Sequence, residues 1–291
     1  MMDAETIWQI KKDMCEIGRR IWLKGFCAAN EGNHSVRIGP DRLLCTPTGI
    51  SKGFMEPDDM CLVDMDGKQV EQNPRGRERS SEVRIHIGIM EKRSDIKAVV
   101  HSHPPHATAF AVANIPLPSG LHPEKEFFLG VVPLAPYATP SKWELAESIT
   151  NVLTPETYAV LMGNHGAVSF SKSLIDAYYK HEILDAHCRI LLLCKELGKA
   201  NVLDHAQMTE LLQVKADAGY PDERLACAPQ GCYEQNNDAF FSQFETRTPS
   251  AMCDCNGGPV RKSLPAQLPG TSDTFETMVH AITEQIMRSV R

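Results

Sequence analysis

The sequence lacks the features that mark membrane-spanning, secreted and nucleic-acid-binding chains. None of its apolar runs approaches the roughly 20 residues of a membrane span. The N-terminal MMDAETIWQIKKDM contains no signal-peptide hydrophobic core. The 37 acidic residues outnumber the 30 lysines and arginines, which gives a net charge of −7 without a long basic run. These absences predict a cytoplasmic protein that has neither a membrane nor a nucleic-acid partner.

Paired cysteine spacings are scarce as well. Of the ten cysteines, only Cys253 and Cys255 form a close pair, in a late, loop-like stretch. No second cysteine or histidine pair stands at a spacing that would complete a cysteine-based metal site. In a reducing compartment we therefore expect buried thiols rather than disulfides, and Cys253 and Cys255 receive no role.

Mixed helical and strand spacing, with early hairpin signals, predicts an α/β or α+β layered domain with a largely antiparallel sheet. Ser80 or Ser81, Ser141 and Ser173 are the expected N-caps, and Gly198 is the expected helix stop. The residues between 115 and 140 are expected to form a loop with one short strand. Helices are expected over residues 6–24, 81–92, 141–153 and 173–198; strands are expected over 34–38, 42–45, 60–64, 68–71, 96–101, 158–162 and 167–170.

Histidines gather where one predicted strand ends, in Ala98-Val-Val-His101-Ser-His103-Pro-Pro-His106. Residues i and i+2 of a strand point to the same face, so His101 and His103 can converge on one ion. The two prolines end the strand, which places His106 outside the ligand set. His165 is the best third ligand, because it lies in a turn between two strands and the glycine after it permits close approach. Three imidazoles with one open position are typical of a catalytic zinc site.

Four motifs together resemble the class II aldolase/adducin family, and most closely its fuculose- and rhamnulose-phosphate aldolases. They are GNHSVRI, SSEVRIH, HSHPPHATA and GNHGAVS, in the expected order between Ile7 and Gly198. The resemblance implies a mostly antiparallel sheet flanked by helices, and a four-fold homotetramer with active sites between subunits.

The resemblance also assigns roles to individual residues. His101, His103 and His165 match the zinc ligands, and Glu82 matches the catalytic base, which can also contact the metal. The residues that match phosphate-binding elements are Asn33, Thr48, Gly49, Ser80 and Ser81. Helix capping by the two serines and ordinary turn chemistry at the other three positions are the alternative interpretations.

The implied activity is zinc-dependent, reversible cleavage of a ketose 1-phosphate to dihydroxyacetone phosphate and an aldehyde such as lactaldehyde. A ribulose-phosphate 4-epimerase is an alternative, although the resemblance places aspartate at the position of Glu82 in those enzymes. A related decarboxylase or dehydratase is a further alternative. Adducin-like members that lack the histidines are disfavoured by the presence of all three here.

One element of the family pattern is missing. Fuculose-phosphate aldolases supply a tyrosine proton donor from the loop before the stretch that reads Ala-Pro-Tyr-Ala-Thr here. In this chain that loop reads SGLHPEKEFFLG and contains no tyrosine. His122, Glu124 and Glu126 are candidate substitutes, and Tyr137 is expected to be structural.

The chain changes character after about Pro221, where helical periodicity fades. We expect a catalytic domain over residues 1–220, a flexible linker over 221–273 and an amphipathic helix over 274–291. This last segment resembles the encapsulation peptides that dock enzymes to bacterial microcompartment shells. Packing of the helix on its own tetramer is the alternative.

Overall fold

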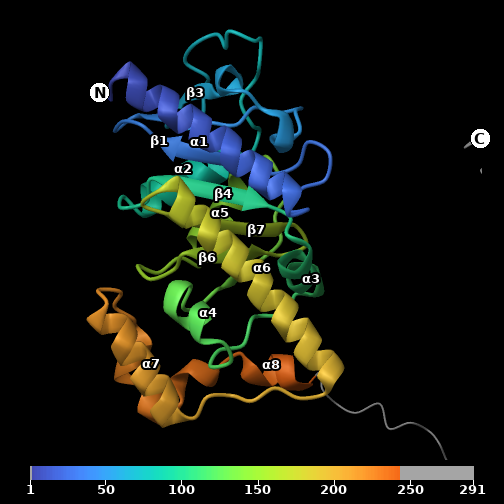
Figure 1. Ribbon diagram of the computed structural model, residues 1–291, viewed down its shortest axis with the longest axis vertical. Coiled ribbons are helices and arrows are strands. Elements are labelled where there is room, and N and C mark those ends of the chain that lie inside the picture. The colour runs from blue at the N-terminus through green and yellow to red at the C-terminus, as the bar shows by residue number, and fades with distance from the viewer. Residues whose placement is uncertain (1, 243–291) are drawn as a thin grey trace, which may run out of the picture. The chain divides into compact units, whose positions relative to one another are not determined.

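The computed structural model describes residues 2–242, and these form a seven-stranded sheet (Figure 1). Its order is β3-β2-β1-β4-β7-β6-β5, and every neighbouring pair is antiparallel except β5 with β6. The prediction of a mostly antiparallel sheet is confirmed. The strands are β1 (Asn33–Arg37), β2 (Arg42–Cys45), β3 (Cys61–Asp64), β4 (Ala98–Ser102), β5 (Leu134–Ala135), β6 (Ala159–Met162) and β7 (Gly166–Ser171).

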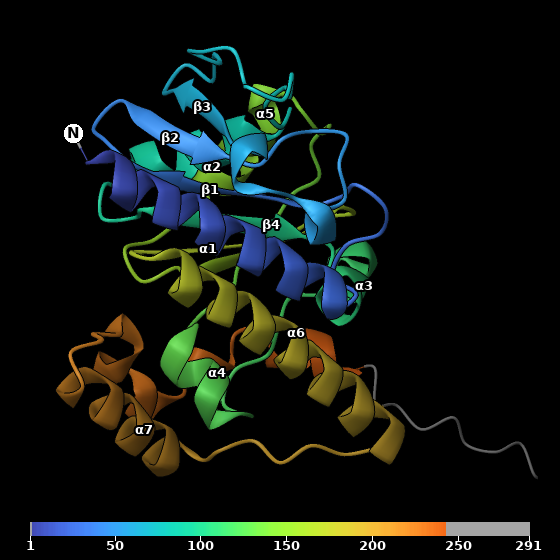
Figure 2. The same cartoon turned by 45° about the horizontal axis from the view of Figure 1, so that its top comes forward.

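Helices cover both faces of this sheet. Helices α1 and α6 lie across one face (Figures 1 and 2), and α2 and α5 pack on the other. The α-helices are α1 (Ala4–Leu23), α2 (Val83–Lys92), α3 (Pro105–Ala113), α4 (Pro123–Phe128), α5 (Trp143–Thr150), α6 (Leu174–Leu197), α7 (His205–Asp217) and α8 (Asn237–Phe241). The 3₁₀ turns are η1 (Lys52–Phe54), η2 (Pro57–Asp59), η3 (Glu223–Ala226), η4 (Ala228–Gln230) and η5 (Cys232–Glu234).

Strand β4 is buried on both faces, and its alternation decides which layer each side chain meets. Val100 belongs to the apolar cluster that includes α1, whereas Val99 packs in the cluster that includes α2. Two residues further along, His101 therefore faces the α2 side, and Ser102 faces α6. The central strand thus carries the first histidine of the cluster into the layer that holds Glu82.

Helix caps agree with the sequence at α6 but not at α2 or α5. The Ser173 side chain accepts a hydrogen bond from the Asp176 backbone N–H, and Gly198 ends the helix at φ 73°, as predicted. Helix α2 instead has Glu82 at its N-cap without a side-chain cap bond. Helix α5 begins after Lys142, likewise without one. Ser141 cannot cap it because its φ is +67° and its hydroxyl donates to Ser81 Oγ.

The prediction of a loop over residues 115–140 missed a helix, and the hairpin strand over 68–71 is wrong. Helix α4 begins with a proline, which suits the first turn of a helix. Of the hairpin strand only an isolated bridge from Val63 to Gln69 forms.

The sequence predicted a flexible linker from residue 221 onward. The structure corrects this prediction over residues 221–242, which are folded. Three 3₁₀ turns and α8 occupy this segment. Ala228 and Tyr233 are buried against Met208 and Leu212 of α7, and Phe240 is buried against the domain core. Composition obscured this packing because its apolar anchors are widely spaced among polar residues.

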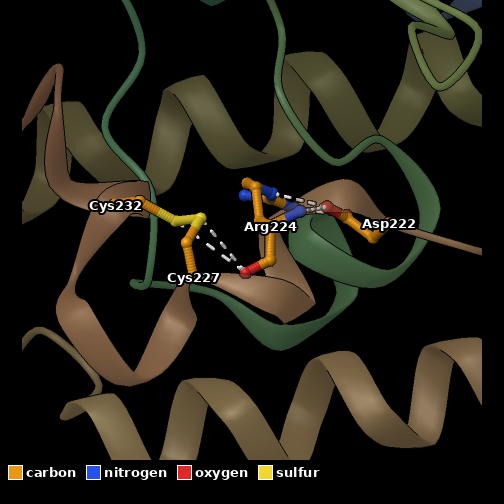
Figure 3. The surroundings of a disulfide bond; sticks show 4 residues. All are labelled: Asp222, Arg224, Cys227 and Cys232. Atoms are coloured by element: carbon orange, nitrogen blue, oxygen red, sulfur yellow. Dashed lines mark hydrogen bonds and ion pairs between the residues drawn. A yellow bond between two sulfur atoms is a disulfide. The ribbon is translucent and has the colours of Figure 1, made fainter.

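A disulfide joins Cys227 to Cys232 (Figure 3), contrary to the expectation of thiols only. The η3–η5 turns bring these two side chains together across a five-residue separation. The other described cysteines are free, and most are buried, as expected.

The remaining predictions for the C-terminal segment fall outside the described residues. These are the linker over 243–273, the amphipathic helix over 274–291, and Cys253 with Cys255. Among residues 2–242, no helix is both long and apolar enough to cross a membrane.

Candidate metal centre

Three histidines meet at the end of the central strands. His101 lies on β4, His103 follows that strand, and His165 lies in the turn between β6 and β7. One nitrogen from each ring lies within 4.8 Å of the other two. The ring centroids are 4.9–5.2 Å apart, so the rings surround a common point. His106 lies outside this group, as the sequence predicted. It bonds instead to Asp185 at 2.9 Å.

Hydrogen bonds on the far side of two rings fix which nitrogen faces the centre. His101 Nδ1 donates to the Ala167 carbonyl at 2.9 Å, and His103 Nδ1 lies 3.1 Å from Glu31 Oε2. The Nε2 atoms of both rings are buried and have no hydrogen-bond partner within residues 2–242. Such partners on Nδ1 typically orient metal-binding histidines and raise the basicity of the free nitrogen.

The tight turn before β7 is required for close approach of His103. A Cβ at Gly166 would lie 2.5 Å from His103 Cδ2 and 2.8 Å from the Ser102 carbonyl oxygen. Asn164 supports the turn in a left-handed conformation at φ 55°. Glycine at position 166 therefore allows both the His103 ring and the Ser102 backbone to lie close to the turn, as expected.

Glu82 completes the centre from the N-terminus of α2. Its Oε2 lies 3.5 Å from His101 Nε2, and its Oε1 lies 3.4 Å from His165 Nε2. Burial alone would raise the pKa of Glu82. The charges of His101 and His165, together with the Asn33 hydrogen bond, outweigh burial and hold this pKa well below its usual range. Glu82 is thus an ionised carboxylate beside two imidazoles.

The donor set fits a divalent cation. Burial and neighbouring His101 lower the pKa of His165 to about 4, which favours the neutral ring that binds metals. Buried imidazole nitrogens without a protein partner are costly unless a ligand occupies them. The Nε2 atoms of His101 and His103 are such nitrogens. Together with the ring of His165 and the adjacent carboxylate, they match zinc-type coordination with a position left for substrate.

The predicted phosphate residues divide into two groups. Thr48 and Ser81 line one open cavity of about 680 Å³, together with Arg79 and Gln69. Gly49 is exposed beside Thr48 at φ 71°. Backbone hydrogen bonds between residues 46–48 and 78–80 bring the two loops together.

Ser80 and Asn33 lie deeper in the fold. Ser80 is buried and its Oγ accepts a 3.3 Å hydrogen bond from the Glu82 backbone N–H. Asn33 is 4% exposed and its amide contacts Glu82 at 2.9 Å. In this structure these two side chains support the carboxylate rather than line the cavity.

Sequence reasoning missed Glu31, His86 and His181. His86 contacts Asn33, and His181 joins Ser102 of β4 to Ser169 of β7 at 2.7 and 3.0 Å. One signal was available, because His86 stands four residues after Glu82 and so shares a face of the helix with it. The positions of Glu31 and His181 in the sequence do not predict their partners.

The candidate proton donors differ in accessibility. Glu126 is fully buried and paired with Lys125 and Arg224, which removes it from consideration. His122 and Glu124 pair at 3.0 Å and both reach the surface. Tyr137, expected to be structural, is 59% exposed.

Fold and site together define a protein with a group of residues suited to a divalent metal: three histidines and one carboxylate meet where the central strands of a helix-flanked, mostly antiparallel sheet end. The model of the Class II Aldolase and Adducin N-terminal domain family matches residues 12–192. The chain belongs to this family, and the resemblance inferred from its motifs is confirmed.

Relatives with different reactions resemble this chain to a similar degree. An L-fuculose phosphate aldolase of Methanocaldococcus jannaschii is 32% identical over 183 residues, covering 63% of this chain and 96% of that protein. A 3-oxo-tetronate 4-phosphate decarboxylase of Haemophilus influenzae is 29% identical over 185 residues, covering 62% and 85%. A solved L-fuculose 1-phosphate aldolase superposes with a TM-score of 0.62 at 26% identity, covering 79% and 97%. The chain therefore belongs to an enzyme family, and its similarity to these relatives does not distinguish an aldolase from a decarboxylase.

Proposed function

We propose that this chain is a zinc-dependent aldolase. It reversibly cleaves a ketose 1-phosphate of the L-fuculose or L-rhamnulose type to dihydroxyacetone phosphate and an aldehyde such as lactaldehyde. The observation that carries the proposal is the ionised Glu82, 3.4–3.5 Å from the Nε2 atoms of His165 and His101. A general base at a metal centre is what proton transfer next to a carbonyl requires.

Each residue of the centre has a distinct task. His101, His103 and His165 would hold zinc, which when bound supplies Lewis-acid stabilisation of the negative charge that develops on substrate oxygens. Glu82 takes and returns the proton on the carbon of dihydroxyacetone phosphate that forms the new bond. Thr48, Gly49 and Ser81 offer hydroxyl and backbone donors to the phosphate from the open cavity.

A decarboxylase acting on a 3-oxo-tetronate 4-phosphate is the second candidate. It is favoured by relatives with that name at 28–29% identity. Loss of CO₂ and cleavage to an aldehyde leave the same kind of carbanion beside a carbonyl, so the same residues would serve either reaction. Epimerase and dehydratase activities remain further alternatives.

One experiment separates these reactions. The zinc-loaded full chain is incubated with a panel of ketose 1-phosphates and with 3-oxo-tetronate 4-phosphate. Dihydroxyacetone phosphate, CO₂ and epimerised pentulose phosphate are each assayed. Release of dihydroxyacetone phosphate and an aldehyde from a ketose 1-phosphate supports the aldolase. Loss of CO₂ from the tetronate also leaves dihydroxyacetone phosphate, so CO₂ release from that substrate with no cleavage of any ketose 1-phosphate overturns it.

Glu82→Gln tests the carboxylate directly. The variant should keep most of its bound zinc, because the three histidines remain, while proton exchange into dihydroxyacetone phosphate falls to background. Exchange is measured by deuterium incorporation from heavy water, with Glu91→Gln, on the same helix and outside the site, as control. Undiminished exchange in the Glu82 variant would remove Glu82 from the mechanism.

Assembly and location belong to the same proposal. We expect a cytoplasmic homotetramer, and light scattering on the purified chain measures its mass.

The proposed role of residues 274–291 as a microcompartment signal is tested by deleting them. Preserved activity with lost shell association supports the signal, and collapse of the tetramer supports self-packing.

A further inference from the structure

Asn33 lies between Glu82 and His86 in a buried chain of hydrogen bonds. Its Nδ2 is 2.9 Å from Glu82 Oε2, and its Oδ1 is 2.6 Å from His86 Nε2. His86 Nδ1 in turn lies 2.7 Å from Ser35 Oγ. Ser35, Asn33 and His86 are each no more than 4% exposed, so water does not compete for these bonds.

The chemistry of these groups allows the chain only one direction. Asn33 turns its NH₂ toward Glu82, where Nδ2 donates to Oε2. Its Oδ1 then faces His86, whose Nε2 must carry the hydrogen. Nδ1 of the neutral ring is left to accept, so Ser35 donates its hydroxyl hydrogen. Every donor therefore points toward Glu82, and one amide orientation alone satisfies all three bonds.

Backbone geometry holds these residues in register. Asn33 and Ser35 are two apart on β1 and face the same side of the sheet. Glu82 and His86 are four apart at the start of α2, on one face of the helix. Asn33 also pairs with His101 across β1 and β4, which places the amide beside the metal centre.

We propose that Asn33, His86 and Ser35 are positioning residues that fix the Glu82 carboxylate for proton transfer. This inference rests on the proposed role of Glu82. The family resemblance grouped Asn33 with Thr48 and Ser81. Those two line an open cavity, whereas the Asn33 amide is buried and its acceptor and one of its donor hydrogens are already used.

The first test needs no substrate. In zinc-loaded protein labelled with ¹⁵N-histidine, the His86 resonance is assigned by its loss in His86→Gln. Long-range ¹H–¹⁵N couplings should show hydrogen on Nε2 and none on Nδ1. Ser35→Ala and Asn33→Ala should each shift this resonance. A hydrogen on Nδ1 of wild-type His86 overturns the chain of donors.

The second test separates positioning from phosphate binding by kinetics. Asn33→Ala should lower kcat by about 100-fold, the order expected when a reacting group is misplaced by about 1 Å, with KM within threefold. His86→Leu should do the same, and His86→Gln should recover part of kcat because it keeps a donor near the position of Nε2–H. An unchanged kcat with a tenfold higher KM in Asn33→Ala would make it a phosphate ligand instead.

His34→Gln is the matched control. His34 is also a buried histidine on β1, but it faces α1, where Nε2 contacts the Met14 carbonyl oxygen at 2.8 Å. Its loss should lower thermal stability without the kcat effect. If the chain cleaves no ketose phosphate, the proposed function fails, while the NMR result still decides whether the donor chain exists.

Discussion

His103 leaves its Nε2 free at the metal centre because Glu31 holds its Nδ1 at 3.1 Å. His101 obtains the same orientation from a backbone carbonyl. A carboxylate polarises the imidazole more strongly than a carbonyl does. The orientation of His103 depends on the Glu31 side chain, whereas that of His101 depends on the backbone. At the residue scale, metal affinity is thus set partly outside the ligand set.

Glu31→Ala should weaken zinc affinity by about 10–100-fold, since loss of such a partner frees the ring to turn. Glu31→Gln should weaken it less, because the amide oxygen can still accept from Nδ1. Affinity is measured by competition with a chromogenic chelator. Glu16→Ala, an exposed carboxylate in surface ion pairs on α1, is the control. Wild-type affinity in Glu31→Ala would show that His103 needs no carboxylate.

At the scale of single elements, the contrast between α5 and α6 shows how a cap works. Both helices are preceded by a serine that the sequence marks as an N-cap. Ser173 has extended backbone angles that let its oxygen meet the Asp176 N–H, whereas Ser141 has a positive φ that turns it away. The pattern of residue types is shared, and the backbone of the preceding loop decides the outcome.

Ser173→Ala should destabilise the protein by about 1 kcal/mol, the usual loss for an N-cap. Ser141→Ala should change stability by less than about 0.5 kcal/mol, as for an ordinary surface position. Chemical denaturation of the two variants side by side measures both values. Equal losses would mean that the cap of α6 contributes nothing beyond a surface hydroxyl.

At the scale of the whole described molecule, five buried charges fasten the segment after α6 to the domain. Arg224 of η3 binds Glu126 of α4 and Asp222, which also pairs with Lys215 of α7; Figure 3 shows Arg224 and Asp222 beside the disulfide. Lys125 completes the cluster through Glu126. Residues 205–230 therefore share a polar core with helix α4.

Glu126→Gln should destabilise the protein by about 3–5 kcal/mol, because Lys125 stays buried without a carboxylate and Arg224 keeps only Asp222. Glu124→Gln, two residues earlier and 63% exposed at its side chain, should cost little. Urea denaturation of both variants at neutral pH measures the difference. A small loss at Glu126 would mean that the cluster relaxes around a neutral side chain.

The same cluster predicts acid sensitivity. Burial alone would raise the pKa of Glu126, but Lys125 and Arg224 lower it; Arg224 and Lys215 do the same for Asp222. Both folded pKa values lie below the unfolded ones of about 4, so this stability is present above that pH and lost as the pH falls. Glu126→Gln should flatten the acid limb of the stability curve.

The sequence by itself determined what depends on short-range periodicity. The two-residue spacing of His101 and His103 fixed their convergence, and 3.6-residue spacing with Ser173 and Gly198 fixed α6. It could not reveal that Asn33 bonds to Glu82 across 49 positions, or that Glu126 is buried by Arg224 across 98. Only the tertiary structure decided those pairings, because they depend on strand register and helix docking, which no local pattern encodes.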